Sequence, residues 1–179
     1  MIDGEERFVN DGLIDAFRHN AWATEQVIAA CRGLSDEQLN SEVAGTFGSI
    51  IAMLRHTIGS EGSYYRRLSG ETPEWYTEAV ETASVDELTA HAADIAGRWE
   101  RFLQTPFDAE RTHVIQWEGN ISRDVPSGVI LVQCLHHSNE HRTQVCTTLT
   151  QIGAPCPQLG VWEFAEETNR APIHTENAG

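Results

Sequence analysis

Helical periodicity is the feature of this sequence that most constrains its fold. Apolar residues recur every three or four positions in four long segments, which places them on one face of each predicted helix. The segments run from about Asp11 to Arg32, from Ser49 to Leu68, from Ser84 to shortly before Pro106, and from Pro126 to Ile152. Helices of this kind bury their apolar faces against one another, so we expect a four-helix bundle.

A different pattern precedes the fourth predicted helix. Between Arg111 and Val125 apolar and polar residues alternate, as in a strand, and Glu118-Gly119-Asn120 can turn the chain. The connections on either side of the third helix are long. We therefore expect an all-α bundle with long connections and a short β-hairpin before the last helix.

The length of 179 residues fits one helical domain over residues 1–165, and residues 166–179 are expected to form a flexible C-terminal tail.

The charge of the chain excludes several classes of function. The 27 acidic residues outnumber the 12 basic ones, all of which are arginine, and the net charge is −15. Such a surface repels phosphate backbones and anionic membranes, so neither nucleic acids nor membranes are expected partners. No stretch approaches the roughly 20 apolar residues of a membrane span, and the acidic N-terminus is unlike a signal peptide. These features indicate a cytoplasmic protein with reduced cysteines.

Two histidines in the fourth predicted helix carry the strongest chemical signal. His137 and His141 are four residues apart and share one helical face, which projection places on the apolar stripe. Buried imidazoles need partners, so the pair either binds a divalent cation or is hydrogen-bonded within the core. The third possibility is that the helix packs in a different orientation from the one projected, so that both histidines lie at the surface. An HxxxH pair on a helix is a recurrent metal-binding pattern, and it favours the first interpretation.

A metal site needs at least one further ligand. His56 in the second predicted helix is the candidate, because nearby Gly59 and Ser60 are small and leave room for a metal, a water molecule and a substrate. An exposed histidine is the alternative. Glu61 is the candidate for a catalytic base or an acceptor beside the metal, and a structural ion pair with an arginine is its alternative. Ser138 stands where HExxH metalloproteases carry the catalytic glutamate, which excludes that class.

Three segments together resemble the DinB-like superfamily of bacterial four-helix metalloproteins, which includes the bacillithiol- and mycothiol-dependent transferases. The first segment is Phe17-Arg18-His19-Asn20-Ala21-Trp22. The second is Leu54-Arg55-His56-Thr57-Ile58-Gly59-Ser60-Glu61, which two tyrosines follow. The third is His137-x-x-x-His141-Arg142-x-Gln144, which is similar to the family's HxxxHRxQ. The resemblance covers most of residues 8–165.

The resemblance implies that His56, His137 and His141 bind one divalent metal ion, zinc or nickel. It also implies a reaction in which this metal activates a low-molecular-weight thiol, such as mycothiol or bacillithiol, to attack an electrophilic substrate. A non-catalytic, stress-associated metal-binding protein and a metal-dependent hydrolase are the alternatives. Thr143 departs from the glycine that many members carry after His-Arg. The resemblance does not extend to the C-terminal domain of the mycothiol-dependent maleylpyruvate isomerases, so we do not expect that activity.

The first predicted helix bears on the oligomeric state. Trp22 lies opposite the apolar stripe of its helix, and the second helix has two faces that need cover. A second copy of the chain would cover them, and dimers are frequent in the family that the sequence resembles, so we expect a homodimer. The alternative is that Trp22 packs beneath the C-terminal segment around Trp162 and Phe164.

Overall fold

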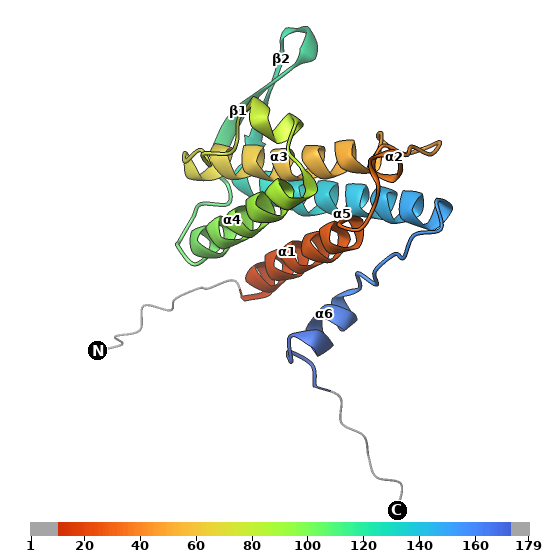
Figure 1. The fold of residues 1–179 in the computed structure, drawn as a ribbon. Coiled ribbons are helices and arrows are strands. Elements are labelled where there is room, and N and C mark those ends of the chain that lie inside the picture. The colour runs from red at the N-terminus through yellow and green to blue at the C-terminus, as the bar shows by residue number, and fades with distance from the viewer. Residues whose placement is uncertain (1–10, 173–179) are drawn as a thin grey trace, which may run out of the picture.

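Four long helices form the body of the computed structural model, which describes residues 11–172 (Figure 1). They are α1 (Asp11–Cys31), α3 (Ile50–Ser69), α4 (Val85–Leu103) and α5 (Ser127–Gln151). Helices α1 and α3 each contact both α4 and α5, so the four close into a bundle. The side chains of Ser49 and Ser84 cap the starts of α3 and α4. The predicted four-helix bundle is confirmed.

Short elements connect and follow the long helices. They are α2 (Asp36–Leu39), the 3-10 turns η1 (Glu78–Glu81) and η2 (Glu118–Asn120), the strands β1 (Thr112–Trp117) and β2 (Ile121–Pro126), and α6 (Val161–Glu167). The hairpin predicted before α5 is therefore present, with β1 and β2 antiparallel. Gly119 and Asn120 in its turn have positive φ, which glycine and asparagine adopt most easily. The hairpin extends away from the bundle (Figure 1).

Two apolar clusters fill the bundle, one toward each end. Phe17, Trp99 and Ile130 belong to one cluster, and Ile28, Ile58 and Leu149 belong to the other. A layer of buried polar residues lies between the two clusters. Its members come from α1, α3 and α5: Asn20, Thr24, Glu61, Ser138 and Arg142. Because each of these side chains must find a polar partner inside the bundle, the layer imposes a specific alignment on the three helices.

Helix α6 covers part of α1 and was not expected from the sequence. It has only seven residues, too few for its periodicity to stand out. Phe164 is buried, and its ring centroid lies 5.8 Å from that of Trp22 and 5.7 Å from that of His19. The predicted tail, residues 166–179, begins within α6, and its residues 173–179 lie outside the described part.

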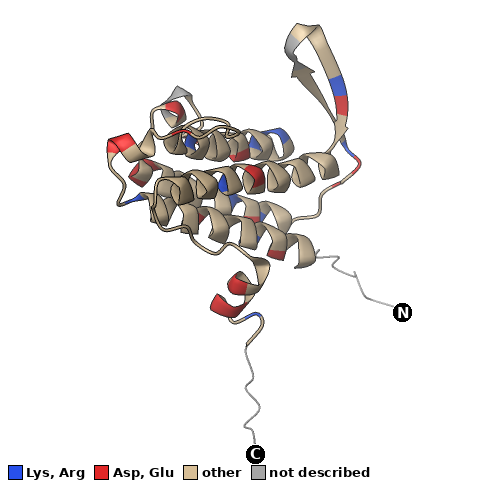
Figure 2. Ribbon diagram, turned by 90° about the vertical axis from the view of Figure 1, so that its right-hand side faces the viewer, with Lys and Arg blue, Asp and Glu red and all other residues tan. Residues whose placement is uncertain are grey.

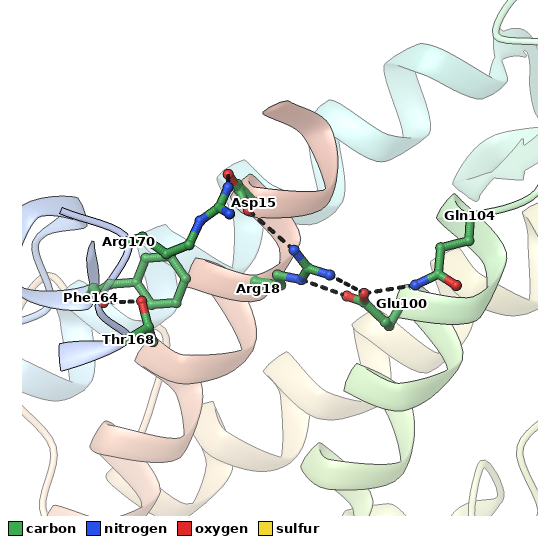
Figure 3. Close-up of polar contacts among 7 residues, drawn as sticks. All are labelled: Asp15, Arg18, Glu100, Gln104, Phe164, Thr168 and Arg170. Carbon is green, nitrogen blue, oxygen red and sulfur yellow. Dashed lines mark hydrogen bonds and ion pairs between the residues drawn. The ribbon is translucent and has the colours of Figure 1, made fainter. Parts of the chain in front are cut away.

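Ion pairs also join α1 to its neighbours (Figure 3). Arg170, just beyond α6, donates a hydrogen bond to Asp15 of α1, and Asp15 also pairs with Arg18 at 3.4 Å. Arg18 in turn donates to both carboxylate oxygens of Glu100 on α4. These groups are substantially exposed, so each pair contributes little to stability and mainly orients α6 and α4 against α1.

Charged residues of both signs are dispersed over the bundle helices (Figure 2). The four cysteines are free thiols. Within residues 11–172, no helix combines the length and the apolar character that crossing a bilayer requires.

Candidate metal centre

Three histidines from two helices converge at one point. His56 comes from α3, and His137 and His141 come from neighbouring turns of α5, the helix that packs along α3. Nε2 of His137 lies 3.0 Å from Nε2 of His56 and 3.2 Å from Nε2 of His141. All three ligand atoms lie within 4.8 Å of one another. His141 is buried and the other two are half-buried, so the three rings form a cluster at the edge of the core.

The geometry of this cluster fits a metal ion. A neutral imidazole has one N–H, so Nε2 of His137 can donate fully to only one of its two neighbours. Its buried Nδ1 has no hydrogen-bond partner in the described part of the chain, so the polar contacts of this ring are made through Nε2. Tetrahedral zinc with its ordinary bonds to nitrogen separates two ligand atoms by roughly 3.3–3.4 Å. The distances of 3.0 and 3.2 Å are close to that spacing.

Gln144 orients one of the candidate ligands. Nδ1 of His141 lies 3.0 Å from Oε1 of Gln144, which can only accept, so this nitrogen carries the proton. The lone pair of His141 is then on Nε2, which faces the cluster. The same Oε1 also accepts the backbone N–H of Phe47 at 3.1 Å. Such outer hydrogen bonds are typical of histidines that bind metals.

Aromatic rings cover the cluster. Phe47 stacks on His56 with ring centroids 4.3 Å apart, and its centroid lies 5.1 Å from that of His141. The ring centroids of Tyr64 and His137 lie 6.0 Å apart, with the two rings nearly perpendicular. Phe47 was not among the predicted site residues. Its one signal was an aromatic residue two positions before the helix cap Ser49, a place where a side chain can fold back over the first turns of α3.

His56 and His137 are held in the form that binds metals. Burial, followed by the neighbouring imidazoles His141, His56 and His136, lowers the pKa of His137 to about 4. Burial and then His141 also lower the pKa of His56. Both rings are therefore neutral at pH 7, and only neutral imidazole offers the lone pair that a cation needs.

A hollow of about 600 Å³ opens beside His56. One wall is the face of α3 that carries small residues, among them Gly59, Ser60 and Ser63. The opposite wall includes Tyr76 and Val80 from the segment between α3 and α4. A small molecule in this hollow would reach one of the three histidines directly.

The sequence profile of the DinB family matches residues 8–175. The chain belongs to the DinB family. A solved structure of a DinB-like protein from Bacillus cereus ATCC 10987 is similar at 18% identity, covers 83% of this chain and 95% of that chain, and superimposes with a TM-score of 0.57. At that identity the likeness concerns the fold alone. No curated protein matches the sequence.

In this DinB-family chain, Glu61 lies in the polar layer of the bundle. It is 4% exposed, and its Oε1 accepts hydrogen bonds from Asn20 Nδ2 at 2.9 Å and from Ser138 Oγ at 2.7 Å. Asn20 Oδ1 in turn accepts from Arg142 Nη1 at 2.7 Å, so Asn20 links the carboxyl group to a buried guanidinium. Burial raises the pKa of Glu61. Within residues 11–172, its hydrogen bonds are with Asn20 and Ser138 and not with a histidine.

Proposed function

We propose that this protein binds one divalent metal ion, zinc or nickel, through Nε2 of His56, His137 and His141. We further propose that it transfers a low-molecular-weight thiol, such as mycothiol or bacillithiol, to an electrophilic substrate. The main support for the proposal is the convergence of three histidines, one of which, His56, lines a hollow. A bound divalent ion supplies the positive charge that keeps a thiol in its nucleophilic thiolate form at neutral pH.

The residues around the cluster have separate tasks in this proposal. Three protein ligands leave a coordination position for a small molecule, as in catalytic rather than structural sites. Gln144 holds His141 with its lone pair toward the cluster, and Phe47 shields His56 from water on one side. The hollow beside His56 admits the reactants. Glu61 is occupied by Asn20 and Ser138, so we propose that it aligns α1, α3 and α5 and is not the proton acceptor of the reaction.

Metal content provides the first test, and α5 offers a matched control. His136 is adjacent to the proposed ligand His137 but is exposed. We expect the purified protein and the His136→Ala variant to carry about one zinc or nickel ion per chain by elemental analysis, and His141→Ala to carry almost none. Full metal content in His141→Ala would refute ligation by the cluster.

Thiol transfer is tested separately. The metal-loaded protein is incubated with mycothiol or bacillithiol and with monobromobimane or chlorodinitrobenzene, and the thioether product is followed by mass spectrometry. We expect faster product formation than in protein-free controls, and loss of this acceleration in His141→Ala but not in His136→Ala. A protein that binds the metal yet accelerates neither thiol would instead be the non-catalytic metal-binding protein.

We also propose that the protein is a homodimer. Phe164 covers one side of Trp22 within the chain, but Trp22 also lines a hollow of about 210 Å³ between α1 and α4, together with the alanines Ala92, Ala93 and Ala96. A second copy packed on these small residues would bury this face. Light scattering should then give a mass of about 40 kDa, twice the 19.9 kDa of the chain. A mass near that of a single chain would contradict the proposal.

A further inference from the structure

A second hollow continues the first along α3. It has a volume of about 570 Å³ and lies between α3, the hairpin and the start of α5. Ser60 and Ser63 line both hollows, so the two meet there. His56 and Arg67 lie on the same face of α3 as these serines, one toward each hollow. A molecule of modest length could therefore lie along α3 with one end at the histidines.

The second hollow is rich in hydrogen-bond donors and lacks acidic residues. Arg67 comes from α3, Arg123 from β2 and Gln133 from α5, and none of the described residues that line the hollow is an aspartate or a glutamate. This is unusual in a chain whose net charge is −15. We call this space the arginine hollow.

Arg67 has no carboxylate partner within residues 11–172. Arg18, Arg98 and Arg170, in contrast, form ion pairs with carboxylates. Its side chain is half-buried against the wall of the hollow. A partly desolvated guanidinium without a carboxylate partner favours an anionic ligand, and its planar pair of N–H groups matches the two oxygens of a carboxylate.

The rest of the lining selects the kind of anion. Aliphatic side chains from the hairpin and α5 form the apolar part of the wall: Ile115, Val125, Val129 and Ile130. The ring of Tyr64 lines the hollow and also meets His137, so the arginine hollow borders the histidine cluster. Apolar walls with guanidinium groups suit a small organic carboxylate whose carbon chain contacts the wall.

We propose that the arginine hollow binds the carboxylate of a small organic anion, and that this carboxylate belongs to the thiol or electrophile that reacts at the histidines. The second half of this statement rests on the proposed function. The carboxylate would be held by Arg67, while the reacting end lies at the cluster beyond Ser60 and Ser63.

Succinate binding to the metal-free chain tests the hollow by itself. By titration calorimetry we expect succinate to bind and its neutral analogue succinamide to bind far more weakly. Arg67→Gln should weaken succinate binding about tenfold or more, since a charge-assisted bidentate contact is lost. The affinity of Arg67→Lys for succinate should lie between that of Arg67→Gln and that of the unmodified chain. Arg101→Gln removes the same charge from an exposed site on α4 and should change nothing. Equal succinate binding by Arg67→Gln and the unmodified chain, or no binding by the latter, would overturn the proposal.

Thiols loaded onto the zinc-bound protein test the connection to the histidines. We expect mercaptosuccinate, which carries both a thiol and carboxylates, to bind at least tenfold more tightly than 2-mercaptoethanol. In Arg67→Gln this advantage should disappear while 2-mercaptoethanol binding stays the same. No advantage in the unmodified protein would overturn the link between the two hollows. Failure of the metal site itself would appear in the metal analysis of His141→Ala and would leave the succinate result intact, so the two failures can be told apart.

Discussion

Gly62 in α3 lies directly beneath two aromatic rings of the segment that follows this helix. A Cβ atom added at Gly62 would lie 2.9 Å from Cδ2 of Tyr76 and 3.0 Å from Cη2 of Trp75. Trp75 is itself held in place, because its Nε1 donates to Asp94 at 2.8 Å and its ring stacks on His91 at 4.8 Å. The Trp75 ring cannot withdraw without breaking these contacts, so we expect Gly62→Ala to destabilise the protein.

The size of the effect follows from two opposing contributions. Alanine is favoured over glycine inside a helix by about 1 kcal/mol. Overpacking against fixed rings costs about 1–3 kcal/mol, so the net loss for Gly62→Ala is about 0–2 kcal/mol. Gly97 in α4 is the matched control, because a Cβ there meets only the flexible end of Arg101, at 3.4 Å. Gly97→Ala should gain about 1 kcal/mol, the helix preference alone.

Urea unfolding followed by circular dichroism measures both variants on the same scale. We expect Gly97→Ala to be more stable than Gly62→Ala by about 1–3 kcal/mol, which is the cost of the overlap. If Gly62→Ala is as stable as Gly97→Ala, then Trp75 and Tyr76 do not pack on α3, and the reasoning about the wall beside His56 is refuted.

Three further predictions concern the cluster. Gln144→Leu should lower metal affinity about 10- to 100-fold in competition with a chelator, because His141 loses the acceptor that orients it; unchanged affinity would contradict this role. The metal-free protein should lose stability to urea as the pH falls from 6.5 toward 4, because His137 takes up a proton near pH 6.5 when unfolded but only near pH 4 when folded. His137→Gln should weaken this dependence, and an unchanged pH profile in that variant would refute the assignment. Phe47→Ala should speed metal loss to a chelator by exposing His56, with little effect on stability because Phe47 is 58% exposed.

Local patterns predicted much of this fold. The four long helices follow from the spacing of apolar residues, and the caps at Ser49 and Ser84 follow from the preference of serine for helix starts. The hairpin follows from an alternating pattern with a turn at Gly119. His137 and His141 could be paired for the same reason, since residues four apart on a helix always share a face.

Tertiary packing decided which residues join that pair. His56 is 81 positions from His137 in the sequence, and the two meet only because α3 and α5 pack along each other in one particular register. Helical periodicity identifies the buried face of each helix but not the neighbour that covers it. For that reason the pattern of the sequence could not decide whether His56 is a metal ligand or an exposed histidine.

The same distinction applies to Glu61, Phe47 and α6. The sequence marked Glu61 as a charged residue within an apolar stripe, and only the packing of α1 and α5 against α3 supplied Asn20 and Ser138 as its partners. Phe47 reaches the cluster because its loop folds over α3 and α5, and α6 finds its place through the contact of Phe164 with Trp22. By itself the sequence determined the four long helices, the hairpin and the shared face of His137 and His141, because these depend on neighbours within a few residues. The cluster, its cover and the buried polar layer depend on contacts between distant segments, and those form only when complementary surfaces pack together.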